Sequence, residues 1–139
     1  MKIIDMRLRP PIPAWIDGPT FRTAMYFPRK IPNLPGARSA WDEDLDELFV
    51  EMDRASVVKG VVIGRASVGA GNLGGVTNQA IVDCVDTYPD RFVGFLGVDL
   101  EHIAESLAEI RDMQGHPNIK GVSIEPGSAK EPRYSDDAS

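Results

Sequence analysis

Apolar residues along this chain form short β-branched runs that alternate with longer stretches of helical spacing. The runs at Ile3 and Ile4, at 57–63, at 91–98 and at 119–124 are typical of buried strands. Between them, apolar residues recur every three or four positions, which predicts amphipathic helices. Alternating strands and helices indicate parallel βαβ units with right-handed crossovers. The pattern predicts an α/β domain with about four parallel strands and three outer helices.

Each of the three helices carries a start signal. The first is expected to begin near Ala40, with Ser39 as N-cap and Asp42 three residues later as an approximate capping box. Thr77 is expected to cap a second helix of about ten residues, and Asp99 a third. No change of composition divides the chain, so residues 1–139 are expected to form a single domain.

A long connection follows the first strand. Residues 10–40 contain seven of the eleven prolines, together with several aromatic residues that include Trp15. Flexible linkers are poor in aromatic residues, so a packed loop that covers something is expected. Residues 128–139 form a polar tail with no apolar period.

Composition narrows the function classes. Hydrophobic residues make up 42% and charged residues 26% of the chain, and the formal net charge is −6. This balance argues against nucleic acid or an anionic membrane as partner, and no apolar run approaches the roughly 18 residues of a membrane span. The single cysteine, Cys84, cannot form an intrachain disulfide, which favours a cytoplasmic protein. It lies within the second predicted helix, and we expect it to be a small core residue.

The first nine residues carry the first candidate site. A short buried strand at Ile3 and Ile4 runs into Asp5, Arg7 and Arg9, and their alternation predicts that these three side chains share one face. Six basic residues and one acidic residue fall within 6–40, which suggests a local field for an anionic ligand such as a carboxylate. A solvated basic loop is the alternative.

A glycine-rich segment follows the second predicted strand. It contains a G-x-G-x-x-G at Gly69, Gly71 and Gly74, as in dinucleotide-binding folds. The four residues 65–68 separate this motif from the strand, whereas the fingerprint needs its first glycine at the turn. A loop at the carboxyl end of the sheet is favoured, and a dinucleotide-binding module using Gly69–Gly74 stays as an alternative.

The candidates for metal or proton chemistry are few. His102 and His116 are predicted at opposite ends of the sheet, so one site cannot use both, and each is expected on the surface. Asp5, Asp99 and Glu125 end predicted strands and could converge. Three carboxylates suit a hard cation or proton transfer better than zinc.

Three passages resemble the amidohydrolase-2 family of metal-dependent TIM-barrel hydrolases and decarboxylases. Residues 3–10 lie where the family has Ile-Asp-x-His-x-His. Asn78 with Tyr88-Pro-Asp-Arg-Phe-Val-Gly-Phe95 is similar to its helix-to-strand segment, and residues 119–126 to its fourth strand. The resemblance implies the N-terminal half of a (β/α)8 barrel, because a complete barrel takes about 250 residues. We therefore expect a fragment, or a half barrel that needs a partner.

The resemblance also implies a function, although this sequence departs from the family's metal-binding motif. The family acts by metal-assisted hydrolysis or decarboxylation of small carboxylate-bearing substrates, and zinc or manganese is expected in a full-length parent. The metal-binding histidines of the first strand are replaced by Arg7 and Arg9, which cannot ligate a metal but could bind an anionic substrate. Asp5 and Glu125 become the candidate catalytic or metal-facing carboxylates.

The 139 residues alone are expected to be inactive. A non-catalytic half barrel is the other alternative, pairing as a homodimer or with a separate second half, because an open sheet leaves two unpaired edges.

Overall fold

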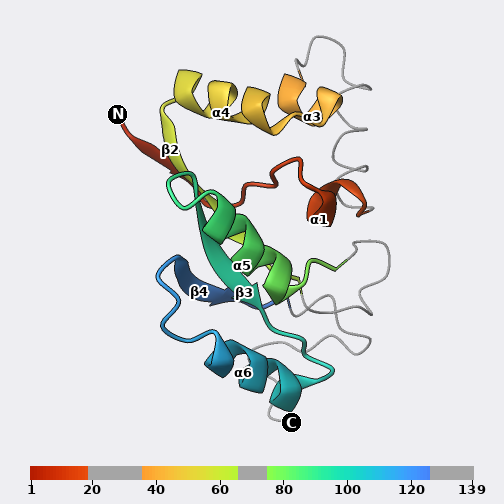
Figure 1. The fold of residues 1–139 in the computed structure, drawn as a ribbon. Coiled ribbons are helices and arrows are strands. Elements are labelled where there is room, and N and C mark those ends of the chain that lie inside the picture. Colours follow the sequence, from red (N-terminus) through yellow and green to blue (C-terminus); the bar gives the residue numbers. More distant parts are fainter. Residues whose placement is uncertain (19–35, 66–74, 126–139) are drawn as a thin grey trace.

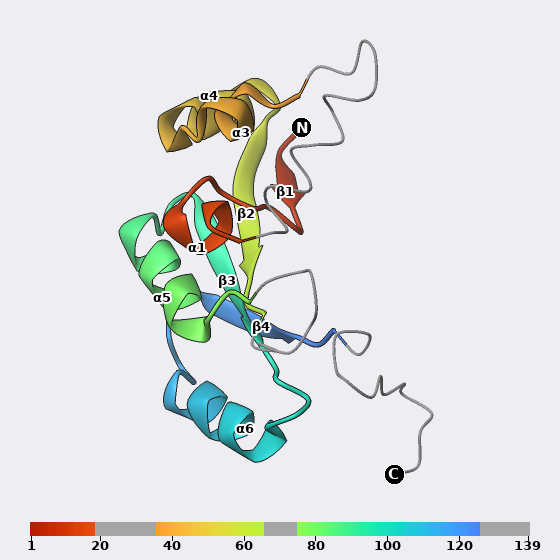
Figure 2. The ribbon, with the colours of Figure 1, turned by 90° about the vertical axis from the view of Figure 1, so that its right-hand side faces the viewer.

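The computed structural model describes residues 1–18, 36–65 and 75–125, and these residues form one parallel sheet with helices (Figure 1). The strands are β1 (Ile3–Asp5), β2 (Val57–Ile63), β3 (Phe92–Gly97) and β4 (Ile119–Ser123), in spatial order β1-β2-β3-β4. All three pairings are parallel, as the alternating pattern predicts. The helices α4, α5 and α6 lie on one side of the sheet (Figure 2).

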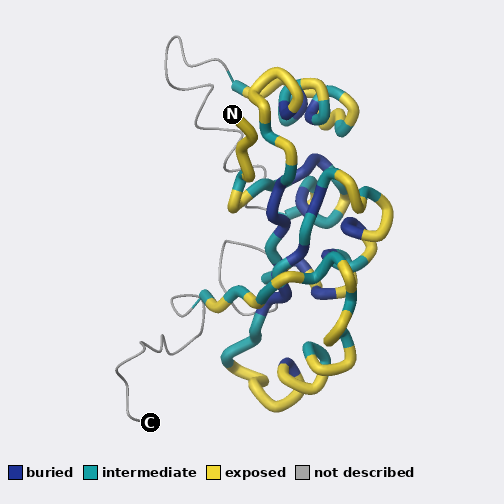
Figure 3. Tube along the Cα trace, turned by 90° about the vertical axis from the view of Figure 1, so that its left-hand side faces the viewer, coloured by how far each residue is buried: buried dark blue, intermediate teal, exposed yellow. Residues whose placement is uncertain are grey.

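The core lies between the two central strands and α5 (Asn78–Thr87). Phe92 and Val62 are fully buried, as are Ile81 and Val85 of α5. A Cβ at Gly94 would lie 2.6 Å from the Ile81 side chain, so glycine lets α5 pack closely on β3. Burial is concentrated in these central elements and falls toward both outer strands (Figure 3).

β1 is not the buried strand that its two isoleucines predict. Ile3 is 38% exposed and Ile4 55% exposed, because β1 is an outer strand that pairs with β2 alone. The strand also ends at Asp5, so the expected alternation through Arg7 and Arg9 does not continue as a strand. The Asp5 carboxylate accepts a hydrogen bond from the Arg7 backbone N–H at 2.9 Å and so turns the chain.

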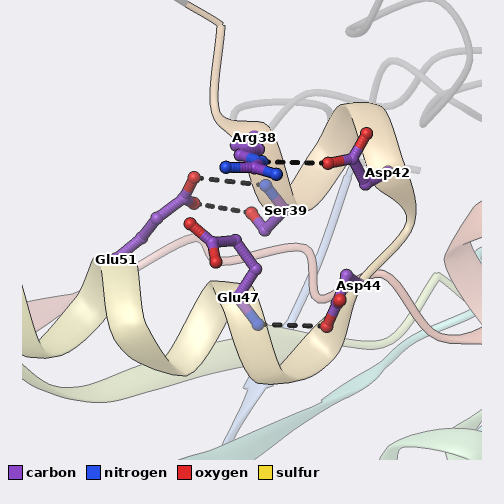
Figure 4. Close-up of polar contacts among 6 residues, drawn as sticks. All are labelled: Arg38, Ser39, Asp42, Asp44, Glu47 and Glu51. Atoms are coloured by element: carbon purple, nitrogen blue, oxygen red, sulfur yellow. Dashed lines mark hydrogen bonds and ion pairs between the residues drawn. The ribbon is translucent and has the colours of Figure 1, made fainter.

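The first predicted helix is divided in two. α3 (Arg38–Asp42) ends at Glu43, which has a left-handed φ of 54°, and α4 (Leu45–Arg54) then begins with Asp44 as its N-cap. The Asp44 side chain accepts from the Glu47 N–H at 3.0 Å (Figure 4). The prediction of one helix capped by Ser39 is therefore wrong.

Ser39 has another structural role. It lies inside α3, is 2% exposed, and donates to the Glu51 carboxylate from its backbone N–H at 3.1 Å and from its hydroxyl at 2.6 Å. Figure 4 shows this contact joining α3 to the body of α4.

The long connection contains a short helix, α1 (Pro13–Ile16), whose Trp15 is 5% exposed within the core. Within the described part of the 10–40 connection, Trp15 packs into the core. Residues 19–35 and the tail 128–139 lie outside the described residues.

Of the two remaining predicted N-caps, that of α5 is confirmed and that of the last helix is wrong. Thr77 caps α5 by accepting from the Ala80 N–H at 3.2 Å, as predicted. α6 (Ile103–Asp112) begins four residues after Asp99, which instead accepts from the Glu101 N–H at 2.9 Å. Asp99 thus caps a turn ahead of the helix. None of the helices within the described ranges is long and apolar enough to span a bilayer.

The amino ends of the strands are closed by an aromatic cluster. Phe49 lies 5.5 Å from Tyr88 and 5.8 Å from Phe92 between ring centroids. Arg91 lies over the Phe49 ring at 5.1 Å and makes a two-pronged ion pair with Asp53 at 2.6 and 3.1 Å. Tyr88, Arg91 and Phe92 therefore have a packing role at the end of the sheet opposite to the candidate site.

Candidate functional site

The carboxyl ends of three strands place four charged side chains around one pocket. Arg7 and Arg9 follow β1, Arg65 follows β2, and Glu125 follows β4. The apolar part of the lining comes from the same strands and the connections that follow them: Leu8, Ala14, Trp15, Ile63 and Val76. Three of the candidate residues, Arg7, Arg9 and Glu125, thus line this pocket, and their roles in binding and catalysis stay predictions.

Arg65 is the site residue that sequence reasoning missed. Its backbone pairs with Val76 through N–H···O contacts of 2.7 and 3.0 Å, and this bridge joins the two ends of the glycine-rich segment. The signal was available, because Arg65 follows β2 closely, as Glu125 follows β4. In the sequence, Arg65 appears only as one of the residues between a strand and the glycines that follow it.

Glu125 is held by two guanidinium groups. Arg65 donates from Nε to Oε1 at 3.1 Å, and its Nη2 lies 3.0 Å from Oε2, so the contact is two-pronged. Arg7 donates from Nη2 to Oε1 at 3.1 Å. The Arg65 side chain is only 13% exposed, which strengthens its contact relative to that of the largely exposed Arg7.

Arg9 differs from the other two arginines. It is half-buried, and within the described part of the chain its guanidinium makes no ion pair with a carboxylate. Burial lowers the pKa of Arg9, the positive charges of Arg7 and Arg65 lower it further, and only Glu125 opposes this. Arg9 still carries its charge near neutral pH, so the described lining of the pocket has three guanidinium groups and one carboxylate.

Asp5 is not brought to the pocket. Its carboxylate binds the Arg7 backbone N–H, and it is absent from the described pocket lining. Of the two carboxylates expected to act together, Glu125 lines this pocket and Asp5 does not.

The described residues do not fit a divalent cation. Among them, no group of three or more His, Cys, Asp or Glu side chains could hold a metal ion. Both oxygens of Glu125 contact guanidinium groups, and Arg7 and Arg9 lie where the resembled family has histidine ligands. Positive charge at this position opposes metal binding.

His102 and Asp99 form a pair at the carboxyl end of β3. His102 Nδ1 lies 3.0 Å from Asp99 Oδ2, and this contact raises the pKa of the exposed His102. Burial would raise the pKa of Asp99, but hydrogen bonds from Glu101 and His102 outweigh it and lower that pKa. His102 is on the surface, as predicted.

His116 is not the surface residue that was expected. Its side chain is 21% exposed and its Nε2 lies 3.0 Å from Asp86 Oδ1 of α5, because the turn before β4 packs against that helix. The glycine motif at Gly69–Gly74 lies outside the described residues.

Asn78 connects the site's end of the sheet to the helices. It is 1% exposed, accepts from the Gly97 N–H at 2.7 Å, and donates to the Gly97 carbonyl at 3.1 Å. The same amide donates to Glu109 of α6 at 3.0 Å. This residue, which contributed to the family resemblance, fixes the end of β3 and the start of α5.

Comparison with solved structures identifies the architecture. The chain is similar over 99% of its length to an uncharacterized TIM-barrel protein from Bordetella bronchiseptica, with 31% sequence identity and a TM-score of 0.80. It spans about half of that protein, 48% of its length. No protein-family model and no curated protein matches the sequence. The chain thus has the fold of half a TIM barrel, as predicted from its sequence.

Proposed function

We propose that this chain carries the substrate-binding half of a TIM-barrel enzyme that acts on a small carboxylate-bearing molecule. The observation that supports this most is the composition of the described pocket lining, where Arg9 lies beside Arg7 and Arg65 and these two contact Glu125. Active sites of TIM barrels lie at the carboxyl ends of the strands, which is where these residues lie.

The three arginines have different roles in this proposal. Arg65 and Arg7 are oriented by Glu125, so a positioned guanidinium array exists before any ligand arrives. Arg9 provides a half-buried guanidinium whose fork geometry matches a carboxylate. Glu125 in this arrangement is a positioning residue, because its two oxygens already accept from arginines.

The reaction class follows from the resemblance to the amidohydrolase-2 family. We propose hydrolysis of a C–N or C–O bond, or decarboxylation, with the group that transfers protons or activates water supplied beyond the described residues. A zinc or manganese ion would need ligands outside them too. Asp5 stays a candidate for proton transfer only if the complete site brings it to the pocket.

Binding of small carboxylates tests the proposal directly. Succinate and benzoate would be titrated calorimetrically into the protein, each beside its neutral amide, succinamide or benzamide. We expect the carboxylates to bind and the amides not to bind. Arg9→Gln is expected to weaken carboxylate binding by about tenfold or more, which corresponds to about 1.4 kcal/mol.

The matched control is Arg54→Gln, which removes an exposed arginine at the end of α4, near the amino ends of the strands. It should bind carboxylates as the unchanged protein does. Equal binding of acid and amide, or equal losses in the Arg9 and Arg54 variants, would contradict the proposal.

A further inference from the structure

The two outer strands carry exposed apolar side chains along open edges. Ile4 on β1 is 55% exposed and Met6 just after it 58% exposed, while Val122 on β4 is 49% exposed and Ile124 55% exposed. In the described sheet, β1 pairs only with β2, and β4 pairs only with β3. Exposed apolar edges favour pairing with further strands.

The two edges are complementary in direction and in position. All four strands run parallel, and β1 and β4 stand at opposite ends of the order (Figures 1 and 2). A strand added beside β4 must run parallel to it to continue the sheet as a barrel, and the β1 edge of an identical sheet meets this need. The β4 edge of that same copy then meets the first β1.

The solved TIM-barrel structure indicates how large a second unit must be to complete a barrel with this chain. This chain matches 48% of its length, so one more unit of nearly equal size completes such a barrel. A twofold rotation about the barrel axis relates two such halves, closes both edges at once and leaves no strand unpaired.

We propose that the β1 and β4 edges form a docking surface for a second copy of this chain, so that two copies assemble one eight-stranded barrel. The interface is isologous, because β1 of each copy meets β4 of the other, and closure stops growth at two copies. Assembly places both copies' Arg7, Arg9 and Arg65 at the same barrel mouth. The proposal concerns the edges and does not depend on carboxylate binding.

The mass of the 139-residue protein in solution is the first readout. Sedimentation equilibrium over a range of concentrations is expected to give about 30 kDa, twice the 15.2 kDa of one chain. Ile4→Lys and Val122→Glu should each shift the protein to the mass of one chain at concentrations where the unchanged protein pairs. A protein that stays at 15.2 kDa throughout would overturn the proposal.

Val50→Lys is the matched control, because Val50 is 40% exposed on α4, two residues from the buried Leu48 and Met52 and thus on the opposite helix face. It should pair like the unchanged protein. Circular dichroism would verify that each variant is folded. A dimer that withstands both edge variants would show a different interface and overturn the proposal.

A double variant tests which edges meet. Ile4→Lys with Val122→Glu places opposite charges across both junctions only if β1 of one copy lies beside β4 of the other. At low salt we expect it to regain pairing relative to either single variant. If it pairs no better than the single variants, β1 and β4 do not face each other and the proposed assembly is wrong.

Discussion

The two ends of this sheet differ in how their charged side chains are paired. At the amino ends, Arg91 is matched one to one by Asp53 and lies over the Phe49 ring. At the carboxyl ends, the described lining of the pocket has three guanidinium groups and one carboxylate, Glu125, which Arg7 and Arg65 contact. The aromatic end stabilises the fold, and the pocket end is where we propose that a carboxylate binds. Substitutions at the two ends are therefore expected to have different effects, on stability at the amino ends and on binding at the pocket.

The largest effect is expected at the closed end. Phe92→Ala removes a fully buried ring that packs on Phe49 and Tyr88. We expect the free energy of unfolding in urea to fall by about 3–5 kcal/mol, because a cavity replaces the ring. Carboxylate affinity of the folded protein should stay unchanged. A loss below about 1 kcal/mol, no larger than that of the exposed Val50→Ala, would refute the packing role.

A smaller effect of the opposite kind is expected at the pocket. Glu125→Gln removes the anion that competes with a bound carboxylate for Arg7 and Arg65. We expect succinate to bind several-fold more tightly, up to about tenfold, or about 1.4 kcal/mol. Calorimetry provides the measurement, with Glu101→Gln on the exposed turn before α6 as the comparison. Weaker binding in the Glu125 variant would instead show that the positioning of Arg7 and Arg65 by Glu125 outweighs its competition with the ligand.

The smallest effect concerns pH and the closed end. Hydrogen bonds from Arg91 lower the pKa of Asp53, so this carboxylate stabilises the folded state above its unfolded pKa of about 4. That stability is lost as pH falls through the folded-state pKa. Urea unfolding between pH 7 and pH 3 should therefore show a shallower decline for Asp53→Asn than for the unchanged protein. Identical pH profiles for Asp53→Asn and the exposed Asp112→Asn would show that Asp53 does not contribute to the pH dependence of stability.

The sequence predicts the α/β order because its signals are local. Thr77 and the apolar spacing after it specify α5, and the β-branched run specifies β2. Errors arise where a second residue competes. Asp44 is a better cap than Ser39, since the Ser39 hydroxyl binds Glu51 twelve positions away. Ile3 and Ile4 have the composition of a buried strand, yet their exposure depends on which strand lies beside them.

The site is predictable as far as strand ends are predictable. Parallel strands bring their carboxyl ends to one edge, and this rule places Arg7, Arg9 and Glu125 together. Asp5 does not line the pocket, because its side chain turns back onto the backbone of Arg7. Arg65 is recognised as a site residue only from its contact with Glu125, sixty positions further along the chain. The roles of these residues in binding and catalysis stay predictions.

The buried cysteine makes this protein its own unfolding reporter. Cys84 is 3% exposed within α5, and burial raises the pKa of its thiol to about 12, so the folded protein holds it unreactive. As the single cysteine of the chain, it reacts with a thiol reagent only when the core around Ile81 and Val85 opens. The rate of labelling thus records how often the half barrel opens, without any introduced probe.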